Sequence, residues 1–322
     1  MIAKWLYKII GAPESPDKKN ETNCDALTSR KNGAKKQQQD EDELQSIHDA
    51  QEALKKLQSL VGLWDIKKQV EKLTAFAWMN KVRESKGLSN HPLSLHMAFK
   101  GNPGTGKTTV ARVLGEILHA MGVLENPTVV EVSRGDLIGE YIGQSLPKVN
   151  KVISKAKGGI LLIDEAYGIV RSDSMRDYGY EVLDHLVKVM EDKRDEIMII
   201  FTGYQKELDD FLSINTGLKS RINYHMEFPD YSEEELLEIF LKLAEERNYE
   251  VSVNAQKKLK ETLRPHSDNG RYVRNILERS IIKKATNLYS KKTESDFKLL
   301  TVDDIVLPPP EMVRGVAGFV QN

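Results

Sequence analysis

The pattern of apolar and polar positions predicts a mixed α/β domain followed by a helical unit. Strand-like apolar segments lie at 97–99, 128–133, 160–163 and 196–204, and segments with helical periodicity separate them. Strands that alternate with helices indicate a parallel sheet covered by helices on both faces. The reaction centre of such a fold is expected at the carboxyl ends of the strands.

The start of the chain predicts little packed structure. Residues 16–43 contain almost no apolar side chain to bury, so we expect residues 1–45 to be mostly a disordered linker. Helical periodicity begins near Leu44. Four apolar residues then suit one side of a helix, namely Ile47, Leu54, Leu57 and Leu60.

The end of the chain predicts a separate helical lid. Ser232 and Glu235 form a capping-box motif that opens an amphipathic helix. Its inward residues are expected to be Leu236, Ile239, Phe240 and Leu243. Helical patterns continue through 255–263 and 270–290. We therefore divide the chain into a large α/β domain at 46–230, an all-helical lid at 231–307 and a tail at 308–322, which begins with three prolines.

Composition and charge narrow the function classes. The chain has 322 residues, of which 40% are hydrophobic, so one good core and a smaller second one are expected. A formal net charge of −1 gives no general attraction to nucleic acid or to an anionic membrane. The single cysteine, Cys24, cannot pair within the chain, which is typical of a reducing compartment and predicts a cytoplasmic protein.

Residues 1–10 are an exception to the polar start of the chain. Lys4 and Lys8 share one helical face, and apolar residues occupy the others. A short amphipathic helix that contacts a membrane or a partner is one interpretation, and a plain terminal helix is the other. No run approaches the roughly 20 apolar residues of a membrane span.

The strongest motif lies between the predicted strand at 97–99 and a predicted helix. Residues 101–108 match G-x-x-x-x-G-K-[ST] at every required position, which predicts a phosphate-binding P-loop rather than a simple flexible glycine loop. Lys107 would reach the β and γ phosphates of ATP, and Thr108 would ligate Mg²⁺. The candidate nucleotide-binding residues of this loop are Gly101, Asn102, Pro103, Gly104, Thr105, Gly106, Lys107, Thr108 and Thr109.

A second motif supplies carboxylates. The apolar run at 160–163 ends in Asp164 and Glu165, where a parallel strand would deliver them to the phosphate site. Asp164 is expected to hold Mg²⁺ through water, and Glu165 to polarise the attacking water as general base. A surface turn is the alternative for such a pair alone, but the P-loop upstream favours the catalytic role.

Several longer strings resemble the CbxX/CfxQ family of AAA+ ATPases, which includes red-type Rubisco activases and stage V sporulation protein K. The resemblance covers about residues 55–307 and leaves out the first 45. It is carried by LVGL at 60–63, MAFKGNPGTGKTTVAR at 97–112, GEYIG at 139–143, GGILLIDEAY at 158–167, GLKSR at 217–221, FPDYS at 228–232 and NGRYVRN at 269–275.

The resemblance implies further site residues. Gly62, with its neighbours Val61 and Leu63, would border the adenine. Arg221 would act as an arginine finger in the neighbouring subunit's site, and an exposed surface arginine is the alternative. On the lid, Arg271 would sense the γ-phosphate, with Arg274 as its rival. The chain departs from the family pattern at the end of the fourth strand, where the polar sensor would be Thr202 or Tyr204.

An arginine that acts in trans implies a ring or filament, and the family implies a homo-hexamer that acts on a protein client. In such rings an aromatic–hydrophobic–glycine loop faces the central channel. Tyr141, Ile142 and Gly143 occupy that place and would grip a polypeptide. The alternative is that Tyr141 packs over its own sheet.

The function expected is therefore an ATPase that pulls on a protein client to remodel it, with ATP and Mg²⁺ as cofactors. A DNA-directed AAA+ loader or switch ATPase is the alternative, although the near-neutral charge and the hydrophobic loop argue against it. A P-loop kinase of small molecules would not need an intersubunit arginine or a lid arginine. The sequence does not name the client, whether Rubisco or a sporulation factor.

Overall fold

The computed structural model describes most of the chain beyond the N-terminal segment. The described residues are 45–46, 48–89, 94–141, 143–170, 179–265, 268–291 and 297–307. The predicted linker, the amphipathic segment at 1–10, Cys24, Ile47, Ile142 and the tail at 308–322 lie outside them. No described helix is long and apolar enough to cross a membrane.

The predicted parallel sheet is present, with five strands in the order β2-β3-β4-β1-β5. The central strand β1 pairs with a parallel neighbour on each side, so that Met97 lies opposite both Ile200 and Tyr224. All the carboxyl ends therefore meet at one edge. The strands are β1 (Met97–Gly101), β2 (Val129–Val132), β3 (Ile160–Ile163), β4 (Met198–Gly203) and β5 (Tyr224–Phe228).

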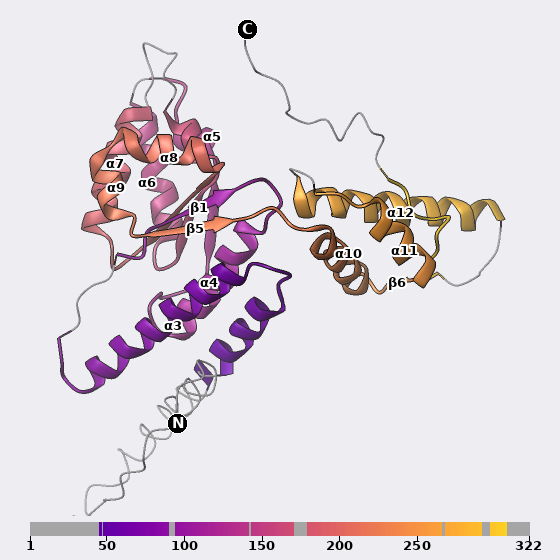
Figure 1. Ribbon diagram of the computed structural model, residues 1–322. Helices are drawn as coiled ribbons and strands as arrows, with labels where there is room; N and C mark the ends of the chain where they lie inside the picture. The colour runs from indigo at the N-terminus through magenta and orange to yellow at the C-terminus, as the bar shows by residue number, and fades with distance from the viewer. Residues whose placement is uncertain are drawn as a thin grey trace, which may run out of the picture.

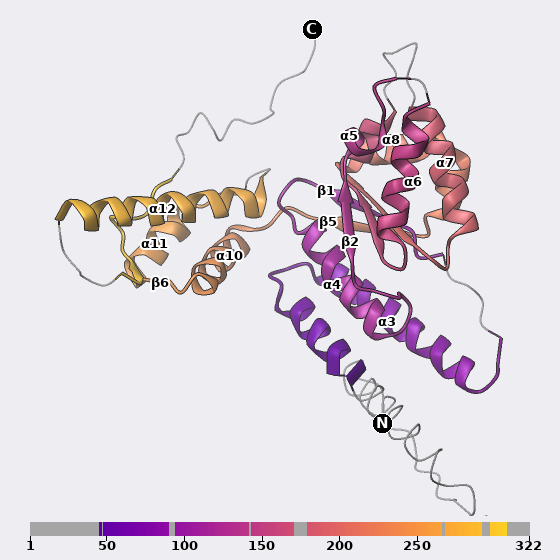
Figure 2. The same ribbon diagram turned by 180° about the vertical axis from the view of Figure 1, so that it is seen from behind.

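Helices cover both faces of the sheet, because successive strand residues are apolar on both sides (Figures 1 and 2). Met97 and Phe99 face one core cluster and Ala98 faces the other. The first face is covered by the helical segment 48–59, α3 (Trp64–Ser85) and α4 (Lys107–Ala120). The second is covered by α6 (Ser145–Ala156), α7 (Gly179–Asp192), α8 (Gln205–Ile214) and α9 (Thr216–Arg221). Two short elements at the carboxyl edge are α5 (Arg134–Leu137) and η1 (Ala166–Ile169).

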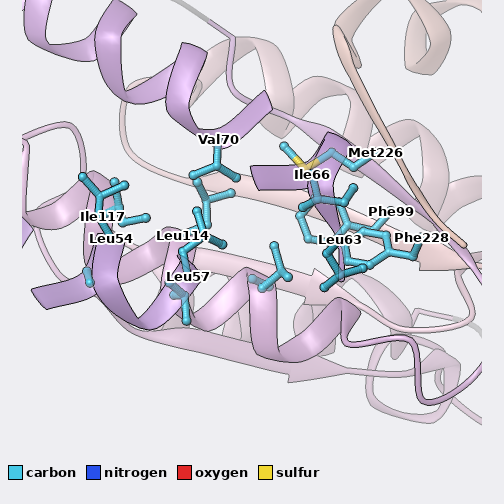
Figure 3. Packing of buried hydrophobic residues seen from close by; sticks show 14 of the residues in the cluster. Leu54, Leu57, Leu63, Ile66, Val70, Phe99, Leu114, Ile117, Met226 and Phe228 are labelled. Carbon is cyan, nitrogen blue, oxygen red and sulfur yellow. The ribbon is translucent and has the colours of Figure 1, made fainter. Parts of the chain in front are cut away.

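The first helical segment is part of the main core (Figure 3). Leu54 and Leu57 are buried there together with Leu114 from α4. Leu60, expected on the same side, is only half-buried. The rings of Phe99 and Phe228 pack with centroids 5.1 Å apart. Burial of a leucine or phenylalanine side chain contributes about 1.5–3 kcal/mol, so this segment is held in place by packing rather than by helix propensity alone.

The helical lid follows β5 directly (Figure 1) and contains α10 (Glu233–Glu246), α11 (Val253–Thr262) and α12 (Asn269–Lys291). The capping box is confirmed, because Ser232 N donates to Glu235 at 2.9 Å and Glu235 N donates to Ser232 Oγ at 3.2 Å. A parallel pair of two-residue strands, β6 (Glu250–Val251) and β7 (Leu299–Leu300), adds to the helices. The sequence analysis expected helices alone, because two residues are too few to show a strand pattern.

A buried imidazole lies at the amino edge of the sheet. His96 is 0% exposed, and its Nδ1 accepts a hydrogen bond from Ile199 N at 3.0 Å. Its Nε2 lies 2.9 Å from Met190 O and must therefore carry the proton. Burial lowers the pKa of His96, against the opposing effect of the Met190 carbonyl. The neutral ring is the form that this fold stabilises.

The low pKa of His96 predicts a stability loss in mild acid. The unfolded chain takes up a proton near pH 6.5 whereas the folded chain does not, so the free energy of unfolding should be highest above that pH and fall as pH drops through it. Urea unfolding between pH 7.5 and 5.5 measures this slope. His96→Gln should flatten it, and His48→Gln, at an exposed position, should not. An unchanged slope in His96→Gln would contradict the assignment.

Candidate nucleotide site

A pocket of about 680 Å³ lies at the carboxyl edge of the sheet, between the P-loop and the lid. This size is ordinary for a small-molecule site. The structure brings to it most of the residues that the sequence singled out. Those that line it are Val61, Leu63, Gly101, Pro103, Gly104, Gly106, Lys107, Thr108, Thr109, Asp164, Glu165, Tyr204, Arg271 and Arg274.

The P-loop connects β1 to α4, as predicted. Gly106 is the N-cap of α4 and has φ +95°, which glycine adopts readily. The Lys107 Nζ donates to the carbonyls of Gly101 and Asn102 at 2.7 Å each. Burial lowers the pKa of Lys107 to about 8, and Asp164 opposes that shift. The loop therefore presents a cation and a helix N-terminus to one pocket, an arrangement suited to phosphate.

The two carboxylates lie at the end of β3. Asp164 is half-buried, and its Oδ1 accepts a hydrogen bond from Thr202 Oγ1 at 2.5 Å. Glu165 is exposed to the pocket and opens η1 with φ +49°, a left-handed conformation. Thr108 lines the same pocket. A hydroxyl and carboxylates are the hard oxygen ligands that Mg²⁺ prefers, so the donor set fits that ion.

The two sensor candidates on β4 differ in position. Thr202 is buried and its hydroxyl is bonded to Asp164. Tyr204 lines the pocket together with Tyr167, with ring centroids 6.2 Å apart. Burial, followed by the charge of Glu165, raises the pKa of both phenols, that of Tyr167 to about 12. Both phenols are therefore neutral donors at the pocket wall near neutral pH.

The two lid arginines both line the pocket from α12. Arg271 is one of the charges that lower the pKa of Lys107, and it acts in the same direction on Tyr204. This places the Arg271 guanidinium within electrostatic range of the P-loop lysine. Arg274 lies about one helical turn further along α12.

Three of the predicted binding residues do not line the pocket; they make contacts within the segments around it. The Asn102 Nδ2 donates to both carboxylate oxygens of Asp230 at 2.9 Å. Thr105 is buried, and its Oγ1 donates to Asn102 O at 2.8 Å. Gly62 has φ +60° and packs against the side chain of Glu235. These contacts fix the conformation of the P-loop and of the segment that leads into α3.

Sequence reasoning missed the apolar wall opposite the P-loop. Ile239 and Leu243, expected to face inward, are half-buried: they pack against the core and also line the pocket, whereas Leu236 and Phe240 are fully buried. Tyr231 completes this wall, and its hydroxyl donates to Thr105 O at 3.1 Å. The signal available was the width of the apolar stripe on α10. Seven of the nine residues at 236–244 are apolar, which is wider than the stripe of roughly 100° that one helix face buries.

Arg221 lies away from this pocket. Its Nε donates to Glu191 at 3.0 Å, and its Nη1 donates to Gly217 O at 3.0 Å. Arg221 ends α9, just before β5 begins at Tyr224 opposite Met97. It therefore lies at the amino edge of the parallel sheet, whereas the P-loop of the same chain lies at the carboxyl edge.

Tyr141 lies on a tight exposed loop between α5 and α6. Its side chain is 67% exposed. The loop is closed by hydrogen bonds from Gly139 N to Ser145 Oγ at 3.0 Å and from Gln144 N to Tyr141 O at 3.2 Å. The alternative that Tyr141 packs over its own sheet is wrong. Gly143 is exposed beside it, and Ile142 lies outside the described residues.

The chain is similar to known proteins over most of its length. Residues 97–230 match the model for the ATPase family associated with various cellular activities (AAA), and residues 232–314 match the AAA lid domain. Stage V sporulation protein K of Bacillus subtilis (strain 168) is 41% identical over 271 residues, which cover 82% of this chain and 84% of that protein.

Two further relatives and one solved structure are also similar to this chain. The chloroplastic ribulose bisphosphate carboxylase/oxygenase activase of Cyanidioschyzon merolae is 40% identical over 77% of this chain and 87% of its own. Protein CbbX of Cereibacter sphaeroides is 40% identical over 75% and 80%. The AAA domain of FIGL-1 in complex with ADP shares the fold, with a TM-score of 0.57 at 17% identity over 81% of this chain and 85% of that chain. The chain is thus an ATP-hydrolysing enzyme that belongs to the CbxX/CfxQ family of AAA+ ATPases.

Proposed function

We propose that this ATPase works in the cytoplasm as a homo-hexameric ring that remodels a protein client by pulling it through a central pore. The observation that carries the proposal is the place of Arg221, at the opposite edge of the sheet from the P-loop of its own chain. From that place its guanidinium does not reach the pocket of its own chain, so as an arginine finger it would act in the site of a neighbour. A head-to-tail contact of this kind, repeated, gives a closed ring when the rotation permits.

Within each subunit the pocket residues divide the work of hydrolysis. Lys107 and the backbone N–H groups of the P-loop bind the phosphates, while Leu63 and the α10 wall border the base. Thr108 and Asp164 would hold Mg²⁺, which when bound neutralises charge on the β and γ phosphates. Glu165 polarises the attacking water as general base.

Three further side chains act around the γ-phosphate. We assign the sensor position at the end of β4 to Tyr204, which lines the pocket, rather than to Thr202, which is bonded to Asp164. Arg271 reaches the γ-phosphate from the lid of the same subunit. Arg221 of the neighbouring subunit stabilises the charge that develops there in the transition state.

Client contact is assigned to the loop of Tyr141, Ile142 and Gly143. An exposed tyrosine on a closed turn presents a large apolar ring to any chain that passes it. The Tyr141 side chain is largely exposed, so its ring is accessible to a partner.

Tyr141→Ala should abolish client work while nucleotide binding, ring assembly and basal ATP hydrolysis continue. Tyr141→Phe should keep most of the work, because the ring and not the hydroxyl makes the contact, and Leu should be intermediate. Client-stimulated ATPase and client remodelling measure the effect. The matched control is Tyr289→Ala, since Tyr289 is 88% exposed on the lid helix α12.

The melting temperature separates this role from a structural one. Removal of a buried aromatic ring costs about 3–5 kcal/mol, whereas loss of the exposed Tyr141 ring should leave the melting temperature close to that of wild type. A strongly destabilised Tyr141→Ala protein, with client work reduced only in proportion to the folded fraction, would count against the pore loop.

A crosslinking group placed at Tyr141 can identify the client. The relatives are named for Rubisco activation and for sporulation, so the client of this chain must be captured directly. A photo-crosslinker at Tyr141, in a Glu165→Gln background with ATP, should bind covalently to the client in native lysate. The same group at Tyr289 is the control. A band that needs ATP and appears only at position 141 supports threading, and DNA bound instead of protein would favour a DNA-directed AAA+ ATPase.

A further inference from the structure

Asn269, the first residue of α12, is a buried polar side chain with an unusual backbone. It is 0% exposed and has φ +45°. Its Nδ2 donates to Asp230 Oδ1 at 2.7 Å and to Pro103 O at 3.4 Å, and its Oδ1 accepts from Tyr231 N at 2.9 Å. A buried amide must satisfy both its donor and its acceptor. Asn269 does so with the P-loop on one side and the start of the lid on the other.

Asp230 connects the same elements from the junction between β5 and α10. Its carboxylate accepts two hydrogen bonds from Asn102 Nδ2, at 2.9 Å each, in addition to the one from Asn269. Hydrogen bonds to an ionised carboxylate are about twice as strong as those between neutral groups. The P-loop, the interdomain junction and α12 thus share one carboxylate.

The backbones of the P-loop and α12 also touch. Gly270 N donates to Gly104 O at 3.0 Å. A Cβ on Gly104 would lie 2.2 Å from Asp268 O and 2.8 Å from Arg271 N, and a Cβ on Gly270 would lie 2.9 Å from Gly104 O. Such contacts exclude a side chain at either glycine. The first turn of α12 is therefore seated directly on the P-loop.

Arg271 is two residues beyond Asn269 in this first turn, its backbone N donates to Asp268 O at 2.9 Å, and it lines the pocket. We propose that Asn269 is a positioning residue that, through Asp230 and the P-loop, aims Arg271 at the γ-phosphate and so sets the preference of the pocket for nucleoside triphosphate over diphosphate. The proposal rests on the role of Arg271 given under the proposed function. It adds that the lid arginine is aimed by an amide that touches neither phosphate nor metal.

The test compares the dissociation constants of the full-length protein for ADP and for the non-hydrolysable triphosphate AMP-PNP, both with Mg²⁺, by titration calorimetry. Arg271→Ala should lower the preference for AMP-PNP by about tenfold or more, the usual effect of a lost hydrogen bond to a charged group. Asn269→Gly keeps the left-handed backbone and removes only the side chain. It should lower the same ratio, and the double variant should lose no more than Arg271→Ala alone, because one residue acts through the other.

Two further variants separate positioning from general stability. Asn248→Gly removes another left-handed asparagine, with φ +60° at the exposed end of α10, and should leave the ratio unchanged. The double variant Asp230→Asn/Asn269→Asp swaps the two side chains, so that the amide at 230 can donate to the carboxylate at 269. It should recover part of the ratio that either single change loses.

The results distinguish the role of Arg271 from the role of Asn269. An unchanged ratio in Arg271→Ala overturns the role of Arg271 and this inference together. A reduced ratio in Arg271→Ala with a wild-type ratio in Asn269→Gly overturns the inference alone. So does an additive double variant, or a lower melting temperature in Asn269→Gly with no change in the ratio.

Discussion

An Arg221→Ala variant is expected to hydrolyse ATP about a thousandfold more slowly than wild type while each subunit still binds ATP. The pocket of its own chain should be intact, because Arg221 lies at the opposite edge of the sheet from the P-loop. Steady-state ATPase rates and a nucleotide titration measure the two effects. Arg194→Ala is the matched control. The Arg194 Nη1 lies 3.5 Å from the Oε1 of the same Glu191, so this variant loses a comparable ion pair but should keep the wild-type rate.

Mixed rings show whether Arg221 acts in trans. Arg221→Ala subunits keep an intact P-loop, and Lys107→Ala subunits keep an intact finger, so neither ring alone should turn over. Rings that contain both should regain activity at interfaces that join one intact finger to one intact P-loop. Inactive mixed rings, with mixing confirmed by a tag on each subunit, would refute action on the neighbour.

The Glu165→Gln variant should bind ATP with wild-type affinity and hydrolyse it about 10²- to 10⁴-fold more slowly, the usual effect of removing a general base. The amide keeps the size and the pocket position of the carboxylate but cannot accept a proton from water. Single-turnover hydrolysis and ATP retention on a desalting column measure this. Lys107→Ala should instead lose nucleotide binding, because it removes the cation that faces the phosphates.

Two other glutamates of the same pocket make the test specific. Glu246→Gln, on the lid side, should hydrolyse ATP normally. Glu131 lies on β2 and pairs with Arg112 at 3.6 Å. If Glu165→Gln turned over normally and Glu131→Gln did not, the general base would be Glu131.

The sequence was sufficient to predict those features that depend on residues close together in the chain. The P-loop and the Asp164–Glu165 pair are contiguous motifs between strongly apolar strands, so their meeting at one edge follows from parallel topology alone. The Ser232–Glu235 capping box was readable for the same reason. Fold class, family and lid were confirmed, because each depends on strand, helix and motif order.

Contacts between residues that lie far apart in the sequence could not be predicted. Asn269 lies 39 positions from Asp230, which in turn lies 128 positions from Asn102, and no periodicity joins them. The choice between Thr202 and Tyr204 depends on which of two nearby polar side chains points to Asp164, which strand alternation alone does not decide. The width of the apolar stripe on α10 does not show which of its residues line a pocket, because a pocket wall and a core both favour apolar side chains.

The backbone at Glu165 lowers the stability of the folded chain. A non-glycine residue in the left-handed region costs about 1–2 kcal/mol, and Glu165 is held at φ +49° between the buried Ile163 and Ala166. A chain selected for thermal stability alone would carry glycine or asparagine at this turn. Glutamate is the less stable choice there, so the residue that gives the ATPase its proposed base also lowers the thermal stability of the nucleotide domain, a cost that other positions of the chain must offset.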